Sequence, residues 1–251
     1  LRYQAMLGQV WWVVRGYASP EAGKAYARAR ELCRTVNLPE LVGPVLAGLW
    51  MFLVVGGQHR QAAVVSDEFI AGITENSDKN TQCASRYTAA LSQYAMGSPK
   101  TSRDQLIQCI NTANPDPEDR TLIQDYGGDI RLTGKCYLSW IYLSLGEIDL
   151  AEEEVQRALS FSEKLNVPTY KTRADWILSM YYAMKGDWVN AETTAKRSLD
   201  EANRLSATMT QGAASMIYFA SQAITQNDSS HIDNMIEGLE LYESSGARFF
   251  T

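Results

Sequence analysis

Apolar, small and turn-forming residues follow one another along this chain in a pattern that repeats. Six segments rich in aromatic and aliphatic side chains each end at a residue that tolerates the left-handed backbone conformation and so closes a helix. These closing positions are Gly16, Gly57, Gly97, Gly146, Gly186 and the Gln226-Asn227-Asp228 turn. The following segments open on capping or acidic residues, as at Ser19-Pro20-Glu21, and centre on alanine, as at Ala22. Period-two alternation, which marks strands, is absent, so the pattern predicts pairs of helices.

The spacing of the turns predicts the architecture. Successive turns lie 41, 40, 49, 40 and 40 residues apart, and a period of this size is typical of helical solenoids. We therefore predict an all-α solenoid of about six helical hairpins with a repeat near 40 residues, in a single domain over residues 1–251. The predicted hairpins cover about 1–39, 40–79, 80–113, 130–168, 169–207 and 208–246, and a seventh would begin at Phe249-Phe250.

The longest interval contains an insertion at about residues 114–129. Two prolines and several acids make its first part, Asn114–Asp119, a loop. Two interpretations stay open for the insertion. It is either a tolerated surface excursion or a segment that folds over the groove of the solenoid or contacts a neighbouring domain.

The first hairpin resembles the tetratricopeptide repeat (TPR). The residues that carry the resemblance are Gln4-x-x-Leu7-Gly8-x-x-Trp11 and Ala22-x-x-x-Tyr26-x-x-Ala29, with Gln4 and Trp11 in place of the usual Trp and Tyr. The resemblance implies a TPR-like right-handed superhelix in which Leu7, Gly8, Ala22 and Ala29 are packing residues. The helices are longer than in the standard repeat of about 34 residues.

The repeat is longer than the standard TPR unit, and this length points to a smaller group of TPR-containing proteins. With the segments Tyr26–Cys33 and Tyr126-Gly127-Gly128-Asp129, the chain resembles the C-terminal TPR part of bacterial signalling proteins that also carry a STAND-type ATPase. Those proteins have a class III adenylate/guanylate cyclase or a transcriptional-regulator domain at the other end. The resemblance implies a bacterial, cytoplasmic signalling protein whose ATPase or cyclase activity lies outside this chain. Leu1 is not an initiator methionine, which agrees with a fragment of a larger protein.

Charge and hydropathy exclude several classes of partner. The net charge is −6 and the basic residues form no block, which argues against nucleic-acid binding by this region. No apolar run approaches the roughly 18–20 residues of a membrane span, and no signal-peptide pattern opens the chain. The four cysteines are widely spaced and are expected to be small buried residues in a reducing compartment, the cytoplasm by default.

The absence of common catalytic and nucleotide-binding motifs from the sequence predicts a non-enzymatic chain without cofactors. No P-loop, G-x-G-x-x-G, G-x-S-x-G or H-E-x-x-H motif occurs. His59, expected in a turn, and His231 belong to different hairpins, so they cannot converge on a metal ion. Glu152-Glu153-Glu154 falls in the first turn of a helix, where the helix dipole favours acids. Asp129 is interpreted as a turn residue, and catalytic, cofactor-binding and metal-binding residues are all predicted to be none.

One surface is predicted to bind a partner. In a TPR-like fold the first helix of each hairpin lines the concave side, and the register places these residues there: Trp12, Met51, Tyr87, Leu91, Tyr94, Trp140, Arg173, Trp176, Met180, Met184 and Met216. Only Lys135 and Arg173 could anchor an acid on this aromatic and methionine-rich face. We therefore predict a regulatory region that binds a polypeptide or another domain of its own chain, such as the ATPase or output module.

Two other interpretations stay open for the same residues. The long helices could close the groove, so that these side chains pack against one another. Alternatively, they could form an enclosed aromatic pocket for a small-molecule effector. The pattern does not fix an oligomeric state.

Overall fold

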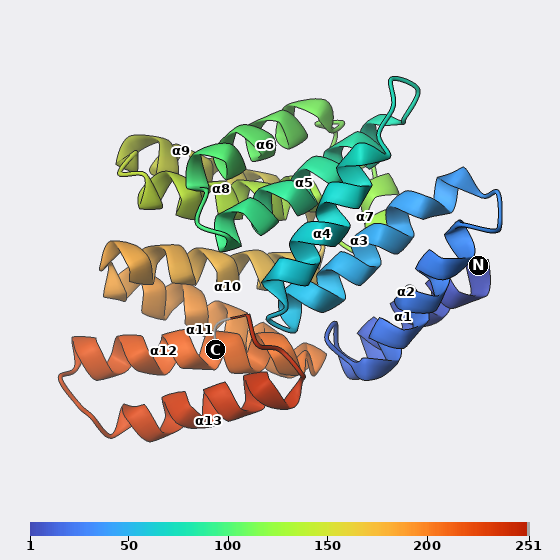
Figure 1. Ribbon diagram of the computed structural model, residues 1–251. Helices are drawn as coiled ribbons and strands as arrows, with labels where there is room; N and C mark the ends of the chain where they lie inside the picture. The colour runs from blue at the N-terminus through green and yellow to red at the C-terminus, as the bar shows by residue number, and fades with distance from the viewer. Residues whose placement is uncertain (250–251) are drawn as a thin grey trace. The chain divides into compact units, whose positions relative to one another are not determined.

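The computed structural model describes residues 1–249, apart from the side chain of Val13. Within this range the chain folds into helices joined by turns and loops, without a strand (Figure 1). The helices are α1 (Arg2–Arg15), α2 (Pro20–Cys33), α3 (Pro39–Val55), α4 (His59–Ala71), α5 (Lys79–Ala95), α6 (Pro99–Thr112), α7 (Thr121–Tyr126), α8 (Ile130–Ser144), α9 (Ile148–Leu165), α10 (Pro168–Lys185), α11 (Trp188–Leu205), α12 (Thr208–Thr225) and α13 (His231–Ser244).

Twelve of these helices pair into six hairpins, as the sequence predicts. The pairs are α1–α2, α3–α4, α5–α6, α8–α9, α10–α11 and α12–α13, and the short α7 lies in the insertion. We call α1, α3, α5, α8, α10 and α12 the first helices, and the other member of each pair the second helix. Every predicted turn contains a residue with positive φ, from 51° at Asn227 to 91° at Gly16. This conformation explains the preference for glycine and asparagine at those positions.

The helices are grouped into two compact units. Unit 1 contains Leu1–Gly134 and the segment that begins at Gly246, and unit 2 contains Lys135–Ser245. The boundary falls inside α8. That residues 1–251 form one domain of a larger protein stays a prediction. Phe249 lies in a turn, and Phe250, the other residue of the expected seventh hairpin, lies outside the described residues.

Small residues let one aromatic ring enter the core of unit 1. The Tyr26 ring of α2 lies so close to α1 and α3 that a Cβ atom at Gly8 would be 2.5 Å from it, and one at Gly48 would be 2.2 Å from it. Burial raises the pKa of the Tyr26 phenol well above its ordinary range. Gly8 therefore packs as the TPR resemblance implies. Leu7, by contrast, lies on an exposed face of α1.

Candidate partner-binding surface

The eleven predicted binding residues lie on the first helices, but they differ in accessibility. The buried members are Trp12, Tyr87, Leu91, Trp140 and Trp176. The half-buried members are Met51, Tyr94, Arg173, Met180 and Met216. Met184, at 45% exposure, is the most accessible of the eleven. The buried side chains offer little area to a partner in this conformation, and the binding role of the set stays a prediction.

Tryptophans connect neighbouring hairpins through their first helices. In unit 1 the Trp50 Nε1 of α3 donates to the Ser92 Oγ of α5 at 2.8 Å. In unit 2 the Trp140 Nε1 of α8 donates to the backbone oxygen of Ile177 in α10 at 2.9 Å. The Tyr137 ring meets the Trp140 ring edge-on, with 5.0 Å between centroids. Large aromatic side chains thus join neighbouring first helices within each unit, and the closed-groove interpretation stays a prediction.

The two basic residues predicted to anchor an acid are already engaged in unit 2. Arg173 donates a hydrogen bond to the Tyr137 hydroxyl. Burial raises the pKa of this phenol, and the positive charge of Arg173 partly lowers it again. The Lys135 Nζ lies 5.5 Å from the centroid of the Phe161 ring. An incoming carboxylate would have to compete with these contacts.

Methionines provide accessible apolar area on the first helices of unit 2. Met180 and Met184 lie one turn apart on α10, and Met216 lies on α12. Met180 packs at the edge of a core cluster that includes Ala191, Ala195 and Ile217. These three methionines are therefore the predicted residues of unit 2 that combine apolar chemistry with accessible surface.

An exposed apolar stripe on α1 was not predicted from the sequence. Tyr3, Met6, Leu7, Val10 and Val14 are between 47% and 86% exposed. Their spacing of three or four residues was a readable signal of one helical face.

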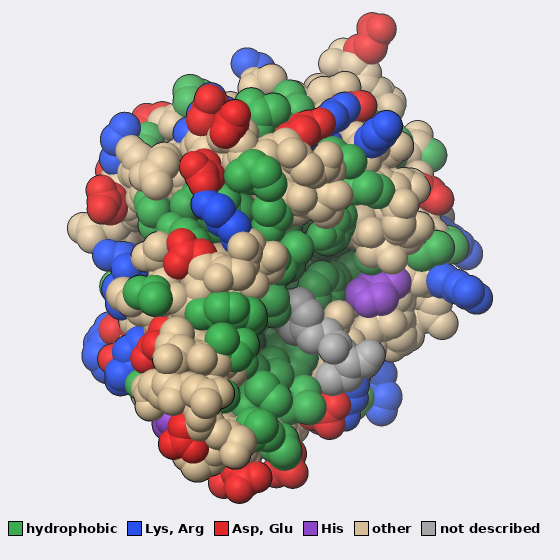
Figure 2. Space-filling model, turned by 90° about the vertical axis from the view of Figure 1, so that its left-hand side faces the viewer, with side chains coloured by type: hydrophobic (Ala, Val, Ile, Leu, Met, Phe, Trp, Pro, Cys, Tyr) green, Lys and Arg blue, Asp and Glu red, His purple; other side chains and the backbone are tan. Residues whose placement is uncertain are grey.

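The surface view shows hydrophobic side chains beside interspersed acidic and basic groups on the face that it displays (Figure 2). No continuous basic area is visible on that face.

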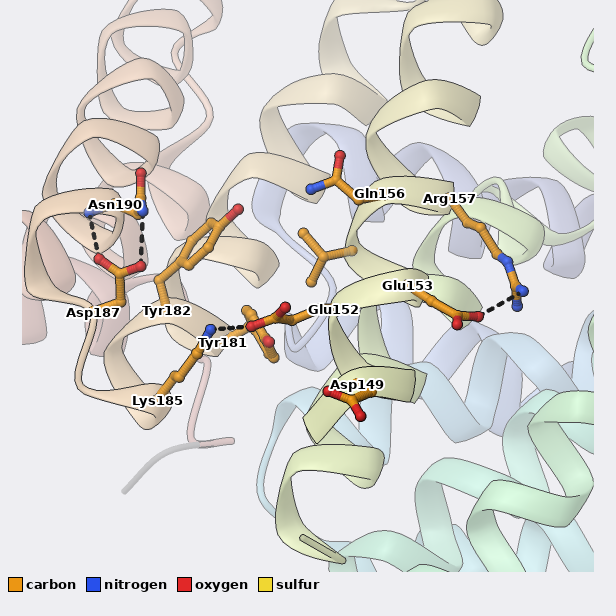
Figure 3. A pocket seen from close by; sticks show the side chains of 11 residues that line it. Asp149, Glu152, Glu153, Gln156, Arg157, Tyr181, Tyr182, Lys185, Asp187 and Asn190 are labelled. Atoms are coloured by element: carbon orange, nitrogen blue, oxygen red, sulfur yellow. Dashed lines mark hydrogen bonds and ion pairs between the residues drawn. The ribbon is translucent and has the colours of Figure 1, made fainter. Parts of the chain in front are cut away.

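A cavity of about 700 Å³ lies within unit 2, between the N-terminal half of α9 and the turn that joins α10 to α11 (Figure 3). Its charged lining consists of Asp149, Glu152, Glu153, Asp187, Arg157 and Lys185. The Lys185 ammonium pairs with Glu152 across the cavity, from α10 to α9. Asp187 caps α11 and accepts a hydrogen bond from Asn190 Nδ2 at 2.7 Å. This charged space differs from the predicted enclosed aromatic pocket, and small-molecule sensing stays a prediction.

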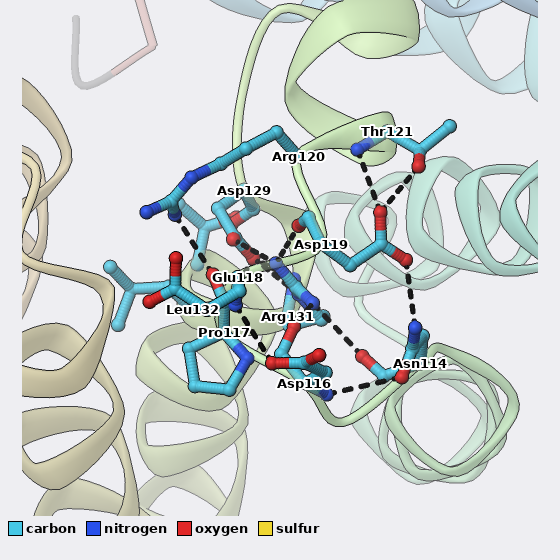
Figure 4. A network of polar contacts seen from close by, with 11 residues as sticks. Asn114, Asp116, Pro117, Glu118, Asp119, Arg120, Thr121, Asp129, Arg131 and Leu132 are labelled. Atoms are coloured by element: carbon cyan, nitrogen blue, oxygen red, sulfur yellow. Dashed lines mark hydrogen bonds and ion pairs between the residues drawn. The ribbon is translucent and has the colours of Figure 1, made fainter.

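A buried ion pair fixes the insertion in unit 1 (Figure 4). The side chains of Asp129 and Arg131 are 0% and 2% exposed, and the Arg131 Nη2 lies 2.6 Å from the Asp129 Oδ2. The same guanidinium donates to the backbone oxygens of Asn114, Asp116 and Asp119 at 2.6–2.9 Å. Asp129 also accepts from the backbone amides of Arg131 and Leu132, which start α8. Asp129 is therefore more than the turn residue that the sequence indicated.

The second part of the insertion packs on first helices of unit 1. The Tyr126 Oη of α7 is 2.9 Å from the Thr81 Oγ1 of α5, and a Cβ at Gly43 of α3 would be 3.0 Å from the same hydroxyl. A Cβ at Gly127 would be 2.9 Å from the Trp12 ring of α1. The insertion therefore packs on three first helices of unit 1, and a role in covering a binding groove stays a prediction.

Other candidate chemistry is sparse in the described part of the chain. No group of three or more His, Cys, Asp or Glu side chains that could hold a metal ion occurs among residues 1–249. No described helix is both long and apolar enough to cross a membrane. His59 is the first residue of α4, which corrects its expected place in a turn. Cys83, Cys109 and Cys136 are buried, as expected, and Cys33 is half-buried.

Comparisons with known proteins place this geometry in a fold class. No family model matches the chain, and no curated protein matches it. Among solved structures it is similar to a Rap protein complexed with Competence and Sporulation Factor, with a TM-score of 0.74 and 15% identity over 97% of this chain. The chain spans 64% of that protein, which is less than two thirds of its length.

Two further structures have lower TM-scores. BtubC (BKLC) from P. vanneervenii gives a TM-score of 0.58 at 16% identity, with 87% of each chain covered. TPR-like repeats of a Podosopora anserina putative kinesin light chain give 0.54 at 12% identity, with coverage of 82% of this chain and 96% of that one. The chain has the TPR-like α-solenoid fold, and the predicted fold class is confirmed.

Proposed function

We propose that this chain is a non-catalytic regulatory region that binds a polypeptide through the accessible methionines of α10 and α12. The observation that carries the proposal is the accessible area of Met180, Met184 and Met216 on α10 and α12, where the large Trp176 side chain of α10 is itself buried. Methionine adapts its shape to varied apolar partners. The similar Rap structure holds the Competence and Sporulation Factor, which supports a binding role for a fold of this kind.

The type of partner and the cellular role in this proposal are taken from the sequence resemblance. In this proposal the partner is a separate polypeptide or another domain of the same protein, such as an ATPase or output module. The protein then acts in bacterial, cytoplasmic signal transduction, and docking on the first helices biases the activity of the output module. Enzymatic activity belongs to that module.

Selection from a random displayed-peptide library tests the methionine surface. Peptides selected on the wild-type chain are expected to bind the triple variant Met180→Gln, Met184→Gln, Met216→Gln about tenfold more weakly, since small losses of apolar burial at three positions sum to about 1.4 kcal/mol. Glutamine keeps the side-chain length and a good helix propensity, so circular dichroism should show an unchanged helical spectrum.

The matched control replaces three exposed apolar residues on second helices of unit 2 by glutamine: Val189, Ile232 and Ile236. Affinities of the selected peptides for this control should stay within about twofold of wild type, because its substitutions lie away from the first helices. Equal losses in the two triple variants, or a failure to select any peptide, would contradict the proposed function.

A further inference from the structure

The cavity between α9, α10 and α11 carries an excess of negative charge. Four carboxylates line it, but only two cationic side chains do. Arg157 is directed to Glu153, with 3.0 Å between Nη2 and Oε2. Asp149 has no hydrogen-bond or ion-pair partner in the described part of the chain. The lining is therefore electrostatically complementary to an additional cation.

A buried hydroxyl in the same cavity also lacks a partner. Tyr181 is 1% exposed, and its Oη makes no hydrogen bond. Tyr181 is one of the residues that line the cavity, and burial raises the pKa of its phenol. Figure 3 shows the Tyr181 ring beside the Lys185–Glu152 pair. Because buried polar atoms are ordinarily hydrogen-bonded, an unsatisfied one at the wall of a cavity points to a missing ligand.

An aromatic face completes the site. The half-buried Tyr182 ring meets the Tyr181 ring edge-on, with 5.3 Å between centroids. In Figure 3 Tyr182 and Gln156 reach into the space between α10 and α9. Tyrosine rings beside carboxylates are a favourable environment for a guanidinium or an ammonium group.

The Lys185 ammonium is a cation that already occupies part of this cavity. Its ammonium pairs with Glu152, and its side chain is 33% exposed. A flexible, solvent-accessible lysine can be displaced by a group that makes more hydrogen bonds. A guanidinium is such a group, because its planar fork presents five N–H donors to several acceptors at once.

We propose that this cavity binds an arginine side chain of the polypeptide partner. The guanidinium displaces Lys185 from Glu152, donates to the Glu152 carboxylate and the Tyr181 Oη, and stacks against the Tyr182 ring. The inference rests on the proposed function, because the arginine belongs to the bound polypeptide. Met184 and Lys185 are consecutive at the end of α10, so the partner should carry an arginine next to an apolar residue.

The test uses the full chain labelled with ¹⁵N and the probe N-acetyl-arginine methylamide. Nuclear magnetic resonance titration should shift the side-chain amide signals of Asn190 and Gln156, which line the cavity. N-acetyl-citrulline methylamide has nearly the same shape without the charge, and it should bind about tenfold more weakly. Free arginine should also bind more weakly than the capped probe, because its charged α-ammonium and α-carboxylate must both lose water where a peptide presents neutral amides.

Substitutions separate the roles of the cavity residues. Glu152→Gln should weaken the arginine probe about tenfold, and Lys185→Gln should strengthen it about threefold by removing the competing cation. Tyr181→Phe should weaken the probe without lowering the thermal midpoint, because the hydroxyl makes no hydrogen bond in the free protein. Glu237→Gln removes one negative charge on α13, outside the cavity, and should leave the affinity within about twofold of wild type.

Equal binding of the arginine and citrulline probes, or equal effects of Glu152→Gln and Glu237→Gln, would overturn the proposal. Tighter binding of free arginine than of the capped probe would overturn the polypeptide as its source. The glutamine variant of the three methionines should leave probe binding unchanged. If the probe binds as expected but no displayed peptide is selected, the proposed function fails and the cation site does not. If selected peptides bind but the probes are not distinguished, only the arginine site fails.

Discussion

Replacing Arg131 by methionine is expected to lower the free energy of unfolding by about 3–5 kcal/mol, the cost of removing one partner of a buried ion pair. Methionine fills much of the volume of the arginine stem but provides no donor. The substitution leaves the Asp129 carboxylate buried without its cation, and it removes the donor from the backbone oxygens of Asn114, Asp116 and Asp119. The same contacts hold the loop that precedes α7, so α7 should lose its protection as well.

Urea denaturation and hydrogen exchange check this expectation. The unfolding transition of the part of the chain that contains the insertion should move to lower urea concentration, and the amides of residues 121–126 should exchange faster. Arg204→Met is the matched control, because Arg204 forms an exposed ion pair with Glu201, and such pairs contribute at most about 1 kcal/mol.

A double-mutant cycle isolates the ion pair. Asn in place of Asp129 keeps an acceptor for the backbone amides at the start of α8 but removes the negative charge. The double variant Asp129→Asn, Arg131→Met should therefore be less destabilised than the sum of the two single variants, by about 1–3 kcal/mol. Strict additivity, or equal small losses for Arg131→Met and Arg204→Met, would show that this pair does not hold the insertion.

Replacing Gly212 by alanine is expected to destabilise unit 2 by about 2–3 kcal/mol, a typical cost of overpacking a close contact. A Cβ at Gly212 would be 2.4 Å from the backbone nitrogen of Tyr242 and 2.7 Å from the backbone oxygen of Gly238. Both atoms belong to the backbone of α13, so relief requires α12 and α13 to separate. This cost exceeds the gain of about 1 kcal/mol that alanine brings to a helix interior.

Gly134→Ala provides a control with the opposite sign. Gly134 also lies inside a helix, but the nearest atoms to its Cβ would be side-chain atoms of Ile110 and Leu106 at 3.6 Å, an ordinary contact distance. This variant should be neutral or up to about 1 kcal/mol more stable than wild type in urea denaturation. A loss in Gly134→Ala as large as that in Gly212→Ala would contradict the role of close helix approach.

The local features of the fold were readable from the sequence because each depends on residues close together in the chain. Glycine and asparagine closed helices where a positive φ was required, as at Gly16 and Asn227, and their spacing predicted the six hairpins. Likewise, the prolines and acids of Asn114–Asp119 predicted a loop. The placement of the candidate residues on first helices followed from the same register.

Whether those residues are buried or accessible depends on segments that are far apart in the chain. The register placed Trp140 on a first helix, but the side chain is buried, and its indole N–H is paired with the backbone oxygen of Ile177, 37 residues away. Arg131 gave no signal in the sequence, because its acceptors are backbone oxygens that only the folded loop brings together. The arginine site needs the ends of three helices around one space. The sequence thus determined the helices, their turns and their pairing, since these rest on local backbone preferences. Tertiary structure alone decided which apolar and charged groups stay accessible, since burial and ion pairing depend on what the distant chain places beside each side chain.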